Sequence, residues 1–140
     1  MTKEEYLSQV LALSRRIDYH RERLYRLRRD ADAVSSRWGE SAGARSADAP
    51  YVRMLEKIES AGEQLASEND LLSRLQEQVE NAIGALPEER MRLVLLYHYL
   101  EGLSYSQIGA QLYLDKGTVY RWKERAVGRF ELPEDPISIS

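Results

Sequence analysis

Apolar residues in the first part of the chain recur alternately four and three positions apart, which is the spacing of a coiled-coil helix. The pattern runs from Lys3 to Val34 without a slip. Its seam positions are Tyr6, Val10, Leu13, Ile17, His20, Leu24, Leu27, Ala31 and Val34. Leu7 and Leu11 widen the apolar face near the start, so we expect this end to contact more than one neighbour. One long helix is predicted over this stretch.

A second pattern with the same spacing begins at Tyr51 and predicts a second long helix. Its seam positions are Tyr51, Leu55, Ile58, Gly62, Leu65, Asn69, Leu72, Gln76, Val79, Ile83 and Leu86. Asn69 is a polar seam residue of the kind that fixes register in coiled coils. Between the two patterns, residues 35–50 are rich in glycine, serine and alanine and end in a proline. They are predicted to be an irregular linker, with Trp38 packed on the helix ends.

Two seams of matched length joined by a linker predict an antiparallel helical hairpin over residues 1–86. The pairing would place residue 6 near residue 83 and residue 34 near residue 55. It would also bring the arginine-rich first helix beside the glutamate-rich second one, with Arg21 near Glu68. A different arrangement stays open, in which one heptad helix pairs with its own copy in a parallel homodimer.

The pattern changes after Leu86 to three short helical segments separated by brief breaks. Pro87 suits the first turn of a helix. Ser104 and Gln107 form a capping-box sequence, which predicts a helix start, and Asp115 is a suitable cap for the next helix. Gly109 lies inside the middle segment, where glycine costs about 1 kcal/mol relative to alanine. A second stretch of backbone passing close to Gly109 would explain that cost. We predict a three-helix head over residues 87–130 whose last two helices form a helix-turn-helix.

The last helix of the head has an apolar and a basic face. Val119, Trp122, Ala126 and Phe130 are spaced to line the buried stripe. From Lys116 to Arg129 there are five basic residues and one acidic residue. A basic second helix of a helix-turn-helix is the element that usually enters the DNA major groove. The candidate DNA-binding residues, on this helix and at the start of the preceding one, are Ser104, Tyr105, Ser106, Lys116, Thr118, Tyr120, Arg121, Lys123 and Arg125.

Composition narrows the function further. The net charge is −3, so a local basic patch and not the whole chain would have to attract DNA. The chain has no cysteine and only two histidines, and no metal site is expected. It carries no phosphate-binding glycine loop and no evident acid/base pair, so we expect neither an enzyme nor a cofactor. No apolar run is long enough for a membrane span, so a cytoplasmic protein with a flexible tail over residues 131–140 is expected.

The head resembles region 4 of bacterial sigma-70-type factors. The residues that carry the resemblance are Leu86-Pro87, Arg90, Val94-Leu95, Tyr97, Gly102-Leu103-Ser104-Tyr105, Gln107-Ile108-Gly109, Leu112, Thr118-Val119 and Ala126. The resemblance implies recognition of promoter DNA and contact with RNA polymerase. Tyr113 departs from the pattern, because it occupies a turn position where glycine or asparagine is usual. Gly117 also departs from it, by removing one base-contacting side chain from the recognition helix.

The order of a helical hairpin followed by such a head is similar to that of phage late transcriptional activators of the RinA and ArpU type. That resemblance implies a phage or prophage regulator acting in the bacterial cytoplasm. Two alternatives stay open. One is a DNA-packaging protein like small terminase subunits, which would assemble as a ring. The other is a protein-interaction module that contacts RNA polymerase without binding DNA.

Overall fold

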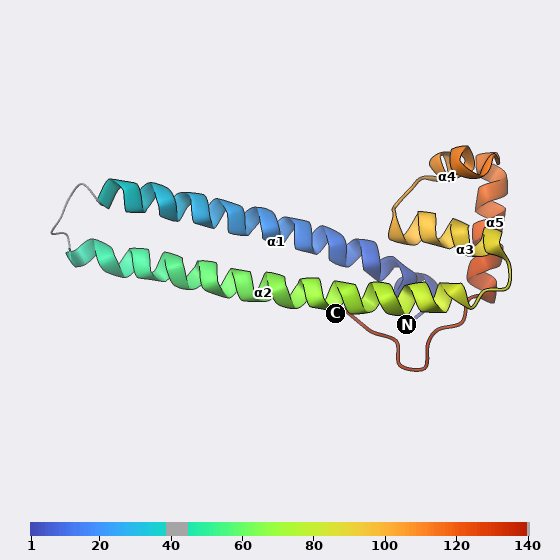
Figure 1. The fold of residues 1–140 in the computed structure, drawn as a ribbon, viewed down its shortest axis with the longest axis horizontal. Coiled ribbons are helices and arrows are strands. Elements are labelled where there is room, and N and C mark those ends of the chain that lie inside the picture. The colour runs from blue at the N-terminus through green and yellow to red at the C-terminus, as the bar shows by residue number, and fades with distance from the viewer. Residues whose placement is uncertain (39–44, 140) are drawn as a thin grey trace. The chain divides into compact units, whose positions relative to one another are not determined.

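The computed structural model describes residues 1–38 and 45–139 and confirms an all-α fold (Figure 1). Its elements are α1 (Lys3–Trp38), α2 (Arg45–Gly84), α3 (Glu89–Leu95), a π-helical turn η1 (Leu96–Leu100), α4 (Tyr105–Leu112) and α5 (Lys116–Arg129). The described residues include no β-strand. Within the same residues, no helix combines the length and the apolar character that crossing a membrane requires.

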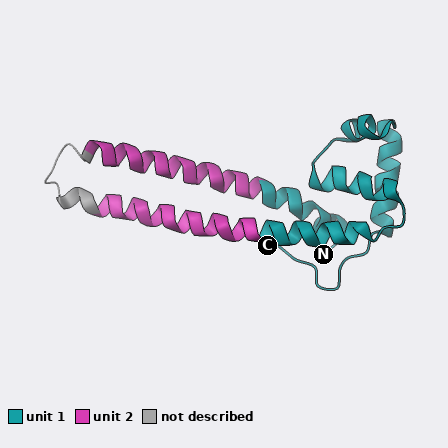
Figure 2. Ribbon diagram, in the orientation of Figure 1, with its two compact units in different colours: residues 1–14, 71–140 teal, residues 15–70 magenta. Residues whose placement is uncertain are grey.

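The chain divides into two compact units, coloured separately in Figure 2. We call residues 15–70 the hairpin unit, and residues 1–14 together with residues 71–140 the head unit. Both long helices run through the two units, since α1 begins in the head unit and α2 ends there. Each unit is described separately below.

In the hairpin unit the two helices form the antiparallel hairpin that the sequence predicts. On α1 the seam residues Ile17, Leu24 and Ala31 are buried as expected. The side chains of His20 and Glu68 are hydrogen-bonded across the hairpin. Their partnership agrees with the antiparallel register, in which paired residue numbers sum to about 89.

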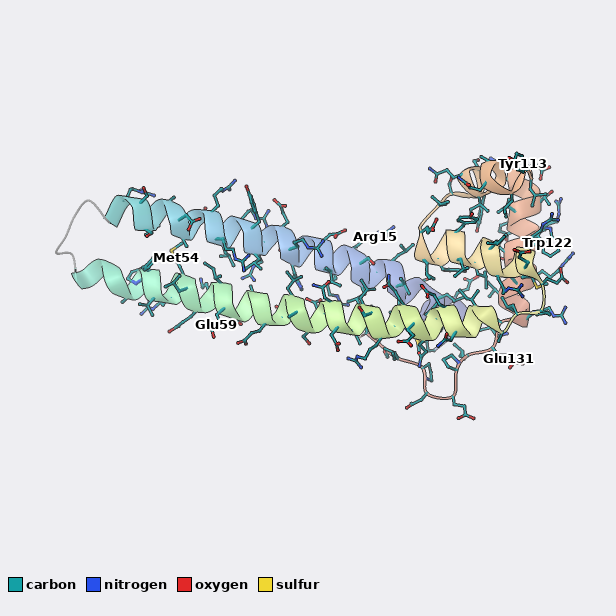
Figure 3. The ribbon with its side chains drawn as sticks, viewed as in Figure 1. Arg15, Met54, Glu59, Tyr113, Trp122 and Glu131 are labelled. Carbon is teal, nitrogen blue, oxygen red and sulfur yellow. The ribbon has the colours of Figure 1, made fainter. Side chains whose placement is uncertain are left out.

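The seam of α2 differs from the predicted one by one position over part of its length. Leu55 and Asn69 were both expected on the seam, and both are exposed. Ala61 and Glu68 are buried instead. Figure 3 shows Met54 between the two helices and Glu59 on the outer side. The polar residue of α2 inside the hairpin is therefore Glu68, not Asn69, because the carboxylate of Glu68 is hydrogen-bonded to His20 of α1.

Glu68 was also expected near Arg21, and it bonds to the residue that precedes Arg21 in the sequence. The carboxylate of Glu68 is hydrogen-bonded to His20, whereas Arg21 donates to Asp18 on its own helix at 3.4 Å. The Arg21–Asp18 pair is exposed, so it stabilises the helix by only about 0.2–0.5 kcal/mol.

The predicted linker over residues 35–50 is largely helical. Residues 35–38 complete α1, and residues 45–50 form the first turns of α2. Pro50 lies inside α2 but close to its start. Its ring removes the N–H that would have bonded four residues back. The expected packing of Trp38 concerns a side chain that lies outside the described residues.

The core of the head unit contains residues from both ends of the chain. Tyr6, Leu7, Val10 and Leu13 of α1 are fully buried, as are Leu75 and Val79 near the end of α2. The ring of Tyr6 stacks on that of Phe130 with centroids 6.1 Å apart. Residues that are far apart in the sequence thus form one hydrophobic core, and the first turns of α1 support the helix-turn-helix as the widened apolar face predicted.

The first helix of the head ends in an unusually wide turn. After α3 the backbone N–H of Glu101 donates to the carbonyl of Leu96 at 3.2 Å, five residues back. The N–H of Leu103 then donates to the carbonyl of Tyr97 at 3.0 Å, which closes the turn before α4. The first bond spans one residue more than an α-helical bond, and the second spans two more. The chain then continues into α4, which packs against α5.

Residues 131–139, which the sequence predicts as a flexible tail, contain no helix and are hydrogen-bonded to side chains of α1 and α2. Figure 1 shows this segment running back beside the part of α2 that belongs to the head unit. Its backbone makes four hydrogen bonds to the side chains of Gln9 and Gln78. These bonds join glutamine side chains to main-chain atoms of the segment. They require no hydrophobic pattern in the sequence of the segment, so hydrophobic periodicity could not predict them.

Candidate nucleic-acid interface

The turn between α4 and α5 has the tight construction of a helix-turn-helix. Ser104 caps α4, accepting from the N–H of Gln107 at 3.2 Å, while the Gln107 side chain accepts from the N–H of Ser104 at 2.9 Å. This is the predicted capping box, formed in both directions. At the other end, the N–H of Leu114 donates to the carbonyl of Gly109 at 2.9 Å. A β-carbon at position 109 would overlap the Leu114 carbonyl oxygen, which confirms the predicted close approach of backbone.

Tyr113 links the two helices in a left-handed backbone conformation, with φ 58° and ψ 44°. The departure from the sigma pattern therefore concerns the residue type, since the turn keeps the conformation that normally favours glycine. Its side chain is 94 % exposed and points away from the helices in Figure 3. The left-handed conformation costs a tyrosine roughly 1–2 kcal/mol.

The recognition helix α5 starts at the predicted cap. Asp115 accepts from the N–H of Thr118 at 2.7 Å, and the hydrogen bonds with Thr118 hold the pKa of the Asp115 carboxyl below its ordinary value. The buried stripe contains Val119, Ala126 and Phe130, all fully inaccessible. Val119 joins Val94 and Ile108 in the core cluster of the head.

Lys123 was predicted to hold a DNA phosphate, but the structure places it inside the head. Its side chain is only 9 % exposed, and its ammonium donates to Glu4 at 3.1 Å and to Glu124 at 3.0 Å. Burial alone would lower the pKa of Lys123, but the two carboxylate bonds outweigh burial and hold the pKa above its ordinary value. Lys123 is thus a charged residue on the buried stripe that is paired with two carboxylates.

Three polar residues of α5 form an accessible stripe along one side of the helix. Thr118, Arg121 and Arg125 are three and four positions apart, and none is buried. The guanidinium of Arg121 donates to the Thr118 hydroxyl at 3.0 Å. A β-carbon at Gly117 would lie 3.8 Å from that same guanidinium. The side chain of Arg121 therefore lies back toward the start of α5, over the position where Gly117 has no side chain.

The accessible face also contains a group of aromatic rings. Tyr105 at the start of α4 meets Tyr120 of α5 edge-on, with centroids 5.6 Å apart, and stacks on His98 at 5.1 Å. Burial lowers the pKa of His98 below its ordinary value. Tyr105 is half-buried and Tyr120 is exposed. Their contact joins the two helices of the motif on one face.

The remaining candidates lie at helix starts. Lys116 and Ser106 are exposed, whereas the Ser104 hydroxyl is engaged in capping. The first N–H groups of α4, at Tyr105 and Ser106, have no acceptor within their own helix. The structure thus brings Tyr105, Ser106, Tyr120 and the start of α5 into one motif.

One feature that sequence reasoning missed is a pair of arginines on either side of Trp122. The guanidinium of Arg90 lies 5.4 Å from the Trp122 ring centroid, and that of Arg125 lies 5.0 Å from it. Trp122 is half-buried against the head core, so the expectation of a core tryptophan holds only in part. Stacking on the ring orders the Arg125 side chain without removing its positive charge. The spacing of Trp122 and Arg125 on one helix is the signal that could have indicated this contact.

The arrangement is that of a binding surface. In the described part of the chain, no group of three or more histidine, cysteine, aspartate or glutamate residues is placed to hold a metal ion. Exposed hydroxyl, phenol and guanidinium groups instead lie along two helices of a helix-turn-helix, which are the groups that contact phosphates and base edges.

Comparison with protein families gives one match in this part of the chain. No curated protein and no solved structure matches the sequence. The family match begins within α2, ten residues before the Leu86-Pro87 pair at which the resemblance starts, and so includes the last turns of that helix. Those turns belong to the head unit. Residues 76–129 match the family model of sigma-70, region 4, so this part of the chain is similar to a helix-turn-helix domain that binds DNA in transcription.

Proposed function

We propose that the protein is a transcriptional regulator that binds a specific duplex DNA site by inserting α5 into the major groove. The observation that carries the proposal is the accessible stripe of Thr118, Arg121 and Arg125 on the recognition helix of a sigma region 4-type domain. Bidentate contact of arginine with guanine is the commonest specific contact in that groove.

Arg121 is the residue that we expect to recognise guanine. Its guanidinium is held by Thr118 near the start of α5, the end of a recognition helix that normally meets base edges. A side chain already fixed by a hydrogen bond loses less conformational freedom on binding. The neighbouring Gly117 adds no side chain between Arg121 and the bases.

The other accessible residues are proposed to position the helix on the DNA backbone. Arg125, ordered on Trp122, and Lys116 at the start of α5 supply positive charge for phosphates. Tyr105 and Ser106 carry hydroxyls at the start of α4, where helix N–H groups can also donate to an anion. Tyr120 would lie over the sugar–phosphate edge next to Tyr105.

The biological setting that we propose is a phage or prophage regulator of late genes in the bacterial cytoplasm. The order of a long helical hairpin followed by a sigma region 4-type head supports this proposal, because it resembles the RinA- and ArpU-type activators. Contact with host RNA polymerase is part of the proposal, since sigma region 4 is a polymerase-associated domain. Pull-down of RNA polymerase by the full-length chain, with and without DNA, tests that contact.

The DNA-binding proposal is tested by selecting bound fragments from random duplex DNA and measuring their affinity in a mobility-shift assay. Arg121→Ala should cost about 1–3 kcal/mol on the selected site and relax the preference at one base pair. Arg23→Ala, which removes an exposed arginine of the hairpin unit, is the matched control and should leave binding unchanged. The proposal would be refuted if the Arg121 variant bound the selected DNA as tightly as the parent does and bound random DNA as the parent does.

A further inference from the structure

The head unit contains a second polar site, built from two glutamines on different helices. Gln9 of α1 donates to the carbonyl of Ile137 at 2.8 Å and accepts from the N–H of Ile139 at 3.0 Å. Gln78 of α2 donates to the carbonyl of Asp135 at 3.0 Å and accepts from the N–H of Ile137 at 3.0 Å. We call these two side chains the Gln9–Gln78 site.

The site binds only main-chain atoms, and it does so at every second residue. In an extended chain the N–H and C=O of one residue point to the same side, and those of the next residue point to the other. Residues 135, 137 and 139 therefore present their backbone groups to the glutamines. Pro136, which has no N–H, falls at an alternate position where none is needed. The two amides thus imitate the edge of a neighbouring β-strand.

Contacts with Tyr6 orient both glutamines. The Tyr6 hydroxyl donates to the Gln78 side-chain oxygen at 2.7 Å, and Gln9 donates to the Tyr6 carbonyl at 3.3 Å. Tyr6 is fully buried, and Gln9 is only 8 % exposed. With residues 135–139 in place, Gln9 uses both its amide N–H group and its carbonyl oxygen in hydrogen bonds to the segment. The two glutamines thus present matched donors and acceptors to a passing main chain.

Occupation by residues 135–139 depends on few apolar contacts. Pro136, Ile137 and Ile139 are only half-buried, and Asp135 is exposed. Each main-chain hydrogen bond contributes a net of about 0.5–1.5 kcal/mol, so the docking free energy is modest. Recognition through the main chain also tolerates different side chains, as in strand addition to a sheet edge.

From these contacts we infer that the Gln9–Gln78 site is a docking site for an extended segment of a partner protein. Residues 135–139 fill it in the isolated chain as a built-in, replaceable occupant. The fitting segment has free N–H groups at positions equivalent to 137 and 139, and it tolerates proline between the contacted residues. Since residues 131–139 follow α5 directly, their replacement releases a segment attached to the end of the recognition helix.

The first experiment tests whether the glutamines hold the segment. Amide hydrogen exchange is followed by NMR in the full-length chain and in Gln78→Met, which keeps the length of the side chain and removes its amide. Exchange of the Ile137 amide should accelerate at least tenfold in the variant. Ile108 and Val119 in the head core report that the fold is retained. Unchanged protection of Ile137 with an intact core would overturn the inference.

The second experiment tests occupation in trans. A short tether gives the built-in segment an effective concentration of order millimolar, so it is weakened first by Ile137→Pro. That change removes the N–H donated to Gln78 and leaves both glutamines intact. A synthetic peptide of residues 131–139 should then bind the full-length variant, shifting the side-chain amide signals of Gln9 and Gln78.

The control peptide has the same sequence with an N-methyl group at the residue equivalent to Ile137, and it should bind at least tenfold more weakly. Equal binding of the two peptides would overturn main-chain recognition. Absence of any shift at millimolar unmodified peptide would overturn the docking site. Loss of DNA binding is no readout in either experiment, so failure here is separate from failure of the proposed function.

Discussion

The carbonyl oxygen of Leu114 occupies the space in which a β-carbon on Gly109 would stand. Gly109→Ala should therefore destabilise the head by roughly 1–3 kcal/mol, because rigid backbone and not a flexible side chain would have to move. Gly128→Ala in α5 is the matched control, since nothing lies within 4 Å of a β-carbon there. It should be neutral or stabilising by up to about 1 kcal/mol. Urea unfolding of the two variants tests the pair, and equal stabilities would contradict the prediction.

Tyr113 gives an opposite expectation for the same turn. Tyr113→Gly should stabilise the head by about 0.5–1 kcal/mol, because relief of the left-handed backbone outweighs the added freedom of the unfolded chain. Tyr113→Ala keeps the backbone cost and removes the exposed ring, so it should show no gain. Thermal unfolding of both variants measures the difference. A gain from alanine equal to that from glycine would assign the effect to the ring.

Asp115 should give the head a dependence on acid pH. Its folded pKa lies below the ordinary value of 3.8, owing to its hydrogen bonds with Thr118. The stability it contributes is therefore present above the unfolded pKa and is lost as the pH falls below 3.8 through the folded pKa. Asp115→Asn still caps the helix but does not titrate in this range. The difference in unfolding free energy between parent and variant should shift between pH 6 and pH 2, and a constant difference would contradict this assignment.

In the hairpin unit, adjacent residues should respond differently to the same substitution. Glu68→Ala leaves His20 without its partner inside the hairpin and should cost roughly 1–3 kcal/mol. Asn69→Ala changes an exposed position and should stay within about 0.5 kcal/mol of the parent. Chemical denaturation distinguishes them. A larger loss of unfolding free energy at position 69 than at position 68 would support the seam that the periodicity predicts.

The two basic residues Lys123 and Arg125 should differ in DNA binding. Arg125→Ala should lower the slope of log affinity against log salt concentration by about 1, as expected for the loss of one phosphate contact. Lys123→Met should leave the slope unchanged, because the ammonium is already neutralised by Glu4 and Glu124. Fluorescence anisotropy at four or more salt concentrations gives both slopes. Equal losses for the two variants would mean that Lys123 leaves its carboxylates on binding.

The parts of the fold that could be predicted from sequence are those with local or periodic signals. Ser104 and Gln107 predicted the start of α4, and Asp115 predicted the start of α5. Gly109 predicted that a second stretch of backbone passes close to it. All three signals depend on interactions between residues a few positions apart. The alternation of fours and threes also predicted both long helices and their antiparallel pairing, since burial repeats regularly along each seam.

What could not be predicted depends on partners distant in sequence. Lys123 is spaced between Val119 and Ala126 like a buried residue, but its charge favoured the exposed face, and only Glu4, from the other end of the chain, explains its burial. Asn69 and Glu68 are both polar, and they fit the seam almost equally. Which of them faces the other helix depends on the partner His20, which lies on α1. The sequence of residues 131–139 contains no signal for their hydrogen bonds to the two glutamines. The one available signal lay elsewhere, in a glutamine at position 9 on an otherwise apolar helix face.

The discontinuous core of the head unit has a kinetic consequence. Residues 1–14 and residues 71–140 must meet across the whole intervening chain, and the entropy cost of such a loop grows with its length. Contacts within a helical hairpin form step by step between short neighbouring stretches, which is faster than one long-range encounter. We therefore expect the two long helices to pair first, beginning with the residues nearest to their connection. The helix-turn-helix would then complete its core as a late event, after residues 1–14 have met residues 71–140.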